Sequence, residues 1–329
     1  MTGLVVEFIL LSSAIVVAGS FLARFADRLG MAGRLSGTIT GVVLLATATS
    51  LPELAVSCTA ALIPAPDLAM GDMLGSCLFN LLILAVLDLF SRTPGRMLSH
   101  TAAAHGLSAT ASILLTSTAL LFILVRVPWS IGRISPGSVM VLLAYVLCLR
   151  LICLDQQLGQ ERLAETQHGT PPRSIRGPLI GYLAMTLVIF LVAPRLAATA
   201  DRLADASHLG GTFVGTVFVA IATSLPEVST TREAVRMGAY DMAVGNILGS
   251  NSFNIVVLFA VDVFYAEPLF SAVSQTHAVT AVCVIIVTAA LTMGLLYRAE
   301  KRWWVFEPDA VLVILLILVS FYLVYSMNE

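Results

Sequence analysis

The chain of 329 residues is 58% hydrophobic and only 12% charged, with a mean hydropathy of +0.94. A soluble domain carries about 25% charged residues, so this composition excludes an ordinary soluble protein and indicates an integral membrane protein. The net charge of −2, without a basic stripe, gives no sign of a nucleic-acid partner and leaves the lipid bilayer and cations as expected partners. The five cysteines lie in apolar segments, which favours buried small side chains over disulfides or a metal cluster.

Ten apolar segments follow one another along the chain, each close to the roughly 20 residues that a helix needs to cross a bilayer. The first lacks a basic n-region, so we expect a retained helix rather than a cleaved signal. The polar stretch 155–177 separates five segments from five and is expected to be a cytoplasmic linker between a first unit, 1–154, and a second, 178–329. The segments are 4–25, 37–62, 67–90, 104–125, 135–154, 178–199, 211–231, 241–264, 276–297 and 308–327.

The basic residues are shared unevenly between the two sets of loops, which bears on orientation because cytoplasmic loops collect lysine and arginine. With the amino terminus outside, fourteen of the 18 basic residues fall on the inside. The other four are Arg126, Arg133, Arg195 and Arg202. The sequence therefore predicts a multi-pass protein of a cell (plasma or inner) membrane, with both termini outside the cytoplasm.

A hexamer, Ala-Thr-Ser-Leu-Pro-Glu, occurs at 48–53 and again at 222–227, 174 positions later. The same offset relates many other positions of 37–90 and 211–264, so these stretches form an internal repeat. Because five is an odd number of helices, the second unit must enter the membrane from the opposite side. The predicted fold is therefore an all-α integral membrane protein with ten transmembrane helices in two inverted five-helix repeats, helices 2 and 7 being broken.

Each hexamer places a proline and a glutamate inside an apolar span. Pro52 and Pro226 lack an N–H, which should free the carbonyls of Ala48 and Ala222. Freed carbonyls and buried carboxylates are tolerated in a membrane only where they line a cavity or find a partner. Hard oxygens with two carboxylates suit Ca²⁺, which takes about 6–8 oxygen ligands. We therefore expect a cation site at the membrane midplane, formed by Glu53, Glu227, Thr49, Ser50, Thr223, Ser224, Ala48 and Ala222.

The following helix of each half carries polar residues four positions apart, which lie along one helical face and are expected to form the opposite wall. They are Asp72, Ser76 and Asn80 in the first half, and Asn246, Ser250 and Asn254 in the second. Asp72, Asn246, Asp67 and Asp241 are candidates for a shell behind the ligands. Asp67 and Asp241 also fit helix N-caps, Asp88 and Asp262 are expected at the membrane interface, and the five histidines show no ligand spacing.

Other interpretations of the paired glutamates stay open. They could form a buried hydrogen-bonded pair that locks the repeats together. An intramembrane aspartyl protease also pairs carboxylates that share a proton, but no Gly-x-Gly-Asp occurs, and Ala69-Met70-Gly71-Asp72 lacks the first glycine. A channel would not need two broken helices with inverted symmetry.

With these motifs, the chain resembles the sodium/calcium exchangers of the cation/Ca²⁺ exchanger superfamily, and among them the bacterial and archaeal ten-helix members. Their alpha-repeats carry T-S-L-P-E followed by G-N-x-x-G-S-N-x-x-N, which matches 37–90 and 211–264. The resemblance implies a secondary transporter, not an enzyme, with no permanently bound cofactor, in which helices 1 and 6 slide against the other helices. It implies that Glu53 and Glu227 are the central Ca²⁺ ligands. It further implies that Ca²⁺ and Na⁺ sites are lined by Thr49, Ser50, Thr223, Ser224, Ser76, Ser250, Asn80 and Asn254.

The sequence departs from that pattern at several positions. Alanines 48 and 222 replace the glycine before T-S-L-P-E, and Asp72 and Cys77 replace two asparagines of the first repeat. Asn254 stands where K⁺-dependent relatives have aspartate. We expect an antiporter that exchanges Ca²⁺ for Na⁺ by alternating access. The alternative is an antiporter coupled to H⁺, for which Asp72 offers a carboxylate, or one for another divalent cation. The oligomeric state stays open.

Overall fold

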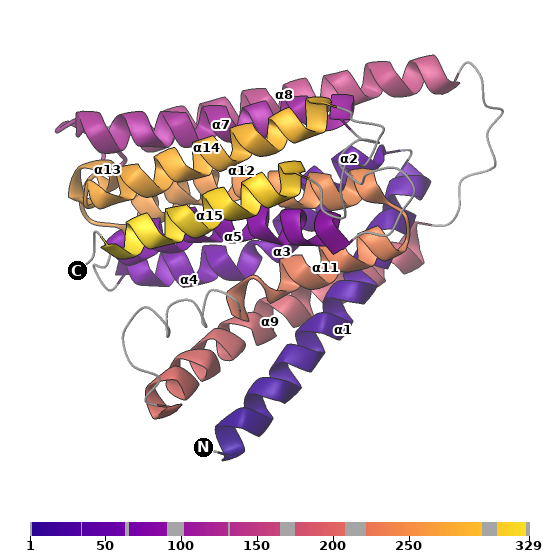
Figure 1. Cartoon of the computed structure of the whole chain (residues 1–329), viewed down its shortest axis with the longest axis horizontal. Helices are drawn as coiled ribbons and strands as arrows, with labels where there is room; N and C mark the ends of the chain where they lie inside the picture. The colour runs from indigo at the N-terminus through magenta and orange to yellow at the C-terminus, as the bar shows by residue number, and fades with distance from the viewer. Residues whose placement is uncertain are drawn as a thin grey trace.

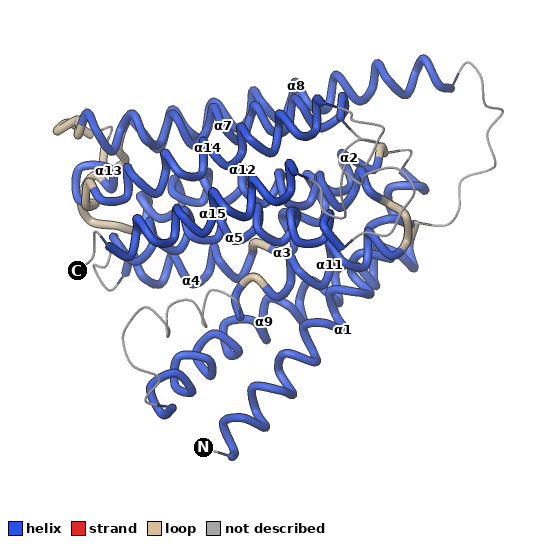
Figure 2. Tube along the Cα trace, in the orientation of Figure 1, coloured by secondary structure: helices blue, strands red, loops and turns tan. Residues whose placement is uncertain are grey.

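The computed structural model describes residues 2–33, 35–62, 66–90, 102–130, 132–164, 175–207, 222–297 and 308–326. Its secondary-structure elements are all helices, as Figures 1 and 2 show. Within these residues, seven helices are long and apolar enough to cross a membrane, and one bent helix pair forms a further candidate span. The prediction of an all-helical membrane protein is confirmed.

The first half of the chain begins with a long helix and continues with a segment broken into short helical pieces. The elements are α1 (Thr2–Gly33), α2 (Gly37–Ile39), the π-helix η1 (Thr40–Leu45), α3 (Ala46–Thr49), α4 (Leu51–Leu62), α5 (Pro66–Phe90), α7 (Ala102–Val125) and α8 (Pro136–Ala164). Ser36 caps the broken segment, because its Oγ accepts a hydrogen bond from the Ile39 backbone N–H at 3.1 Å.

The second half repeats this order. The elements are α9 (Arg176–Ser207), α11 (Leu225–Arg236), α12 (Tyr240–Phe264), α13 (Leu269–Ala272), α14 (Thr276–Tyr297) and α15 (Pro308–Ser326). Nine of the ten predicted segments correspond to these helices. The tenth, 211–231, lies partly outside the described residues, and α11 forms its second part.

Three predicted segment ends are wrong. Helix α8 continues to Ala164, so the predicted linker 155–177 begins as helix, and α1 and α9 continue to Gly33 and Ser207. The predicted ends fell where charged residues first appear. Lysine, arginine and glutamate are good helix formers, so a helix does not stop where it leaves the hydrocarbon.

Helices α5 and α12 lie at the centre of the molecule, whereas α1 and α9 pack along each other and lean away from the other helices (Figure 1). In the most apolar stretches of α5 and α12, 61% and 72% of the residues are buried, against 17% in α1 and in α9. The main hydrophobic core joins α5 and α12 to α7 and α14. A second, smaller core joins α1 and α9 to the broken segments.

Glycines bring the first broken segment into backbone contact with α12. A Cβ atom on Gly249 would lie 2.6 Å from the Val42 Cα atom, and one on Gly41 would overlap the Met242 carbonyl oxygen. Small residues allow such close helix approach in membranes. This contact places the break directly against the polar residues of α12. The hairpins α4–α5 and α11–α12 lie at opposite ends of the molecule, as inverted repeats require (Figure 1).

Candidate cation site

Both hexamers interrupt a helix with the same backbone conformation. Ser50 has φ −91° and ψ 5°, and Ser224 has φ −84° and ψ 7°, in the sparsely populated region between helix and strand. The chain bends by 40° between Gly37–Thr49 and Leu51–Cys58. Figure 2 shows two short loop segments in the middle of the molecule. The predicted break in helix 2 is therefore present, and the break at Ser224 matches it, although residues 208–221 lie outside the described part of helix 7.

The two glutamates follow the breaks and lie in the interior. Glu53 is 2% exposed and Glu227 1%, each in the first turn of its helix. Ser50 Oγ donates a long hydrogen bond of 3.5 Å to Glu227 Oε1, which links the first break to the second glutamate. Glu227 and Asp72 both lie close enough to Glu53 to repel its charge when they are ionised. Two ionised carboxylates in such a place need a compensating cation or protons.

The serines and threonines at the breaks connect them to the helices of the opposite wall. Thr49 Oγ1 donates to the Leu45 carbonyl oxygen at 3.1 Å and lies 3.5 Å from Ser250 Oγ on α12. Ser76 on α5 and Thr223 beside the second break are also buried. Ala48 and Ala222 are both 1% exposed and belong to the smaller core. The two breaks and the two walls therefore come together in one polar region.

An asparagine that sequence reasoning missed holds this region together. Asn251 Oδ1 accepts a hydrogen bond of 3.1 Å from Asn80 Nδ2, and Asn251 Nδ2 donates to the Cys77 carbonyl oxygen at 3.2 Å. Asn251 therefore fixes α5 against α12 and orients the Asn80 amide. The 174-residue offset offered a signal for it. Asn251 is the repeat equivalent of Cys77, a position at which the first half departs from the repeat pattern.

Six buried side-chain oxygen atoms of the breaks and their walls have no hydrogen-bond partner among the described residues. They are Glu53 Oε2, Glu227 Oε2, Ser224 Oγ, Asn80 Oδ1, Asn246 Oδ1 and Asn254 Oδ1. A buried acceptor without a donor costs about 1–3 kcal/mol, and a bound cation removes that cost. No group of three or more His, Cys, Asp and Glu side chains suited to a metal gathers among the described residues. A cation here would thus be bound by two carboxylates and neutral oxygens, a combination that suits Ca²⁺ and Na⁺ better than a transition metal.

Asp72 and Asn246 lie beside the site and contact the helix that follows each break. Ser57 Oγ on α4 donates to Asp72 Oδ2 at 2.9 Å. Asn246 Nδ2 donates to two hydroxyls of α11, Thr230 Oγ1 at 3.1 Å and Thr231 Oγ1 at 2.9 Å. Positions 72 and 246 are repeat equivalents, and both contact a hydroxyl of the preceding helix. Asp72 accepts the hydrogen bond, whereas Asn246 donates it.

Asp67 and Asp241 make their contacts at the helix ends, away from the glutamates. Asp67 Oδ1 accepts from the Ser274 backbone N–H at 2.6 Å and lies 3.1 Å from His277 Nε2. Asp241 Oδ1 lies 3.3 Å from His105 Nε2. The N-cap of α12 is Ala239, so the N-cap interpretation of Asp241 is wrong. The histidines had shown no pattern because their partners are more than 130 residues away in sequence.

Asp262 lies at a helix end, as predicted, but it is not solvated. Its carboxylate is fully buried and accepts hydrogen bonds from Ser135 N at 2.6 Å, Ser135 Oγ at 2.7 Å and Leu269 N at 2.7 Å. Its repeat equivalent Asp88 is also buried, with 2% exposed. Both aspartates are therefore structural elements of the interior.

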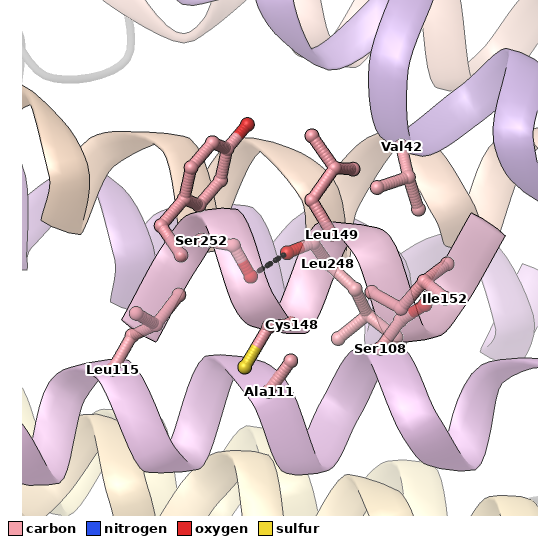
Figure 3. Close-up of a pocket in the computed structure, with 10 residues that line it drawn as sticks. Val42, Ser108, Ala111, Leu115, Cys148, Leu149, Ile152, Leu248 and Ser252 are labelled. Atoms are coloured by element: carbon pink, nitrogen blue, oxygen red, sulfur yellow. Dashed lines mark hydrogen bonds between the residues drawn. The ribbon is translucent and has the colours of Figure 1, made fainter. Parts of the chain in front are cut away.

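A small cavity between α7, α8, α12 and η1 is separate from this site (Figure 3). Most of its lining is apolar, with Leu115, Leu149 and Ile152 among the residues that line it. Ser252 Oγ points into this region but is satisfied by the Leu248 carbonyl oxygen at 3.0 Å. The cavity has no carboxylate and does not qualify as a cation site.

Comparison with known proteins finds one family model that matches both halves of the chain, and relatives that match parts of it. The model of the family described as sodium/calcium exchanger protein matches residues 3–154 and 178–328. The inner membrane protein YrbG of Escherichia coli K12 is 31% identical over 267 residues, covering 76% of this chain and 78% of that protein. The sodium/calcium exchanger MaX1 of Methanosarcina acetivorans is 37% identical over 93 residues, 28% of this chain and 26% of its own.

The fold is also found among solved structures. A structure of the sodium-calcium exchanger NCX_Mj, soaked with zero Na⁺ and Ca²⁺, superposes with a TM-score of 0.74 at 22% identity, covering 98% of this chain and 99% of that one. A second structure of the same exchanger, soaked with Na⁺ and Sr²⁺, has a TM-score of 0.74 at 21% identity and covers the same shares of both chains. At this level of identity the similarity concerns the fold.

Proposed function

This chain belongs to the sodium/calcium exchanger family, and on that premise we propose that it exchanges Ca²⁺ for Na⁺ across a cell membrane by alternating access. Membership of this family makes it a cation antiporter and not an enzyme. The choice of Na⁺ as counter-ion, and of the ligands named below, is our proposal.

The observation that carries the proposal is the pair of buried carboxylates at two matching helix breaks. Glu53 and Glu227 together cancel the charge of one Ca²⁺, and Asn80 Oδ1 on α5 and Asn254 Oδ1 on α12 are buried acceptors without a donor. The other proposed ligands are Thr49, Ser50, Thr223, Ser224, Ser76, Ser250 and the carbonyls of Ala48 and Ala222. Na⁺ competes for the same oxygens, because it is also a hard cation that prefers oxygen ligands.

Coupling follows from the cost of burying charge. Without cations, two uncompensated carboxylates would have to be enclosed in a low-dielectric interior, which is strongly unfavourable. The site can therefore close and reopen on the other side only when Ca²⁺ or Na⁺ neutralises Glu53 and Glu227. This condition prevents either gradient from collapsing without exchange.

The relatives support this assignment. MaX1 is named a sodium/calcium exchanger, and YrbG an inner membrane protein. The charge bias predicts both termini outside the cytoplasm. Exchange against an inward Na⁺ gradient would drive Ca²⁺ export.

The test is ⁴⁵Ca²⁺ uptake into proteoliposomes preloaded with Na⁺, compared with proteoliposomes preloaded with K⁺ or choline. We expect uptake only with internal Na⁺, and none in Glu53→Gln. Glu7→Gln is the matched control, because Glu7 is exposed on α1. Uptake in Glu53→Gln equal to that in the control would contradict the proposal.

Asp72 favours one alternative, an antiporter coupled to H⁺, since a third carboxylate beside Glu53 could take up a proton. An imposed pH gradient in liposomes without Na⁺ separates the two functions. Uptake driven by the pH gradient alone would replace Na⁺ with H⁺ as the counter-ion.

A further inference from the structure

The two halves differ in charge at one pair of equivalent positions. Position 72 is a carboxylate that accepts from Ser57, and position 246 is an amide that donates to Thr230 and Thr231. Threonine 231 is the repeat equivalent of Ser57. The contact is thus conserved between the halves, while the negative charge occurs only in the first.

These two contacts lie on opposite sides of the glutamates. Ser57 is one helical turn beyond Glu53 on α4, and Asp72 is one turn before Ser76 on α5. The Ser57–Asp72 contact therefore lies between Glu53 and the α4–α5 end of the molecule. By the same spacing, Thr231–Asn246 lies between Glu227 and the α11–α12 end. Figure 1 shows these two hairpins at opposite ends.

The two side chains also differ in accessibility. Asp72 is partly exposed, whereas Asn246 is fully buried. Ser57 Oγ donates to one of the two Asp72 oxygens, Oδ2. Next to it, Glu53 Oε2 is buried and without a donor, and the Asp72 charge acts on Glu53. A cation that approaches from the α4–α5 end would meet Asp72 before it reaches Glu53.

We propose that Asp72 is an access site for cations on the α4–α5 side of the transport site, and that Asn246 leaves the α11–α12 side neutral. This inference depends on the proposed antiport function. A fixed negative charge on an access route raises the local cation concentration and the association rate. The attraction scales with ion charge, so it favours Ca²⁺ over Na⁺. The carrier should thus bind Ca²⁺ with a lower half-saturating concentration from the α4–α5 side, which the charge bias predicts to be the outside.

The test measures the half-saturating Ca²⁺ concentration of Na⁺-dependent exchange separately on each face, in right-side-out and inside-out membrane vesicles. Asp72→Asn should raise this concentration on the order of tenfold on the α4–α5 face and change it little on the other. Asn246→Asp should lower it on the α11–α12 face. The double variant Asp72→Asn/Asn246→Asp should exchange the two values. Ser57→Ala, which keeps the charge, should shift the value less than Asp72→Asn does.

Equal shifts on both faces, or no shift in a variant that elutes as a monodisperse protein, would overturn the proposal. The wild-type protein separates this failure from that of the antiport function. If wild-type vesicles show no Na⁺-dependent Ca²⁺ exchange, the antiport function is wrong. If they show exchange and Asp72→Asn leaves both faces unchanged, only the access site is wrong.

Discussion

The two halves of the molecule share the backbone of the helix break and differ in the polar groups around it. Ser50 and Ser224 have nearly the same dihedral angles, and the glutamates that follow are equally buried. Asp72 and Asn246 differ in charge, although both contact a hydroxyl of the preceding helix. The comparison shows that the hexamer determines the helix break. The polar groups on the two sides of the site differ because they come from the neighbouring helices, α5 and α12.

The crossing of α5 and α12 shows a second difference. Asn251 both donates and accepts a hydrogen bond across the crossing, but its equivalent Cys77 contributes a weak thiol contact of 3.7 Å to the Asn251 carbonyl oxygen. The side-chain amide of Asn251 alone therefore fixes the crossing of α5 and α12. A second amide at position 77 would be possible by the repeat pattern, but that position is a cysteine. The first half depends on the second for the orientation of Asn80.

The helix ends show what the halves keep in common. Asp67 and Asp241 are repeat equivalents, and each lies beside a histidine from the other half, His277 and His105. The halves are thus linked reciprocally near both ends of the core helices. The two pairs differ in burial, because the His105 side chain is 0% exposed and that of His277 is 15%.

The largest expected effect comes from the feature that the halves share most closely. Glu227→Gln should abolish Na⁺-dependent Ca²⁺ uptake as completely as Glu53→Gln, with at least about a hundredfold loss, because each removes half of the charge that binds Ca²⁺. The measurement is initial ⁴⁵Ca²⁺ uptake, with Glu7→Gln as control. If uptake survives in one variant alone, the glutamates are not equivalent ligands.

The next effect concerns stability, at Asp262. Asp262→Ala removes a buried carboxylate that accepts three hydrogen bonds, from Ser135 N, Ser135 Oγ and Leu269 N. Leaving these donors without an acceptor should lower the free energy of unfolding by about 3–5 kcal/mol, although Asp262 does not contact the cation site. Thermal unfolding in detergent measures the loss. A melting temperature equal to that of the wild type would show that the Ser135 and Leu269 donors find other acceptors.

The parts of the molecule that were predictable from sequence are those encoded locally. Pro52 within Thr-Ser-Leu-Pro-Glu indicates a broken helix because proline removes a backbone donor, and the break is where it was predicted. The repeat offset also selected Ser76, Asn80, Ser250 and Asn254, which are buried on α5 and α12; their role as ligands stays a prediction. The His105–Asp241 contact could not be predicted, because it joins residues 136 positions apart without a repeated spacing. The three hydrogen bonds of Asp262 could not be predicted, because their donors, Ser135 and Leu269, come from other segments whose positions depend on tertiary packing.

A moderate effect should distinguish the two sides of the α5–α12 crossing. Asn251→Ala leaves the buried Asn80 Nδ2 without its partner and removes the additional hydrogen bond to the Cys77 carbonyl oxygen, which should lower the free energy of unfolding by about 2–3 kcal/mol. It should also weaken Ca²⁺ binding, because the Asn80 amide is no longer oriented. Cys77→Ala should cost about 1 kcal/mol or less in hydrogen bonding, since a thiol is a weak donor. Unfolding experiments and Ca²⁺ titrations on both variants test whether Asn251→Ala has the larger effect. Equal losses of unfolding free energy in the two variants would contradict the prediction.

The smallest effect should separate the two histidine–aspartate pairs. Both histidines lose one hydrogen bond on replacement by alanine, worth about 0.5–1.5 kcal/mol. His105→Ala should cost about 1–2 kcal/mol more than His277→Ala, because the His105 side chain is completely enclosed and its removal leaves a cavity. Asp241→Asn keeps the size of the side chain, so it measures the contribution of charge at the first pair. A larger loss in His277→Ala would contradict this order. It would mean that the 3.1 Å hydrogen bond from His277 to the half-exposed Asp67 contributes more to stability than the burial of the His105 side chain does.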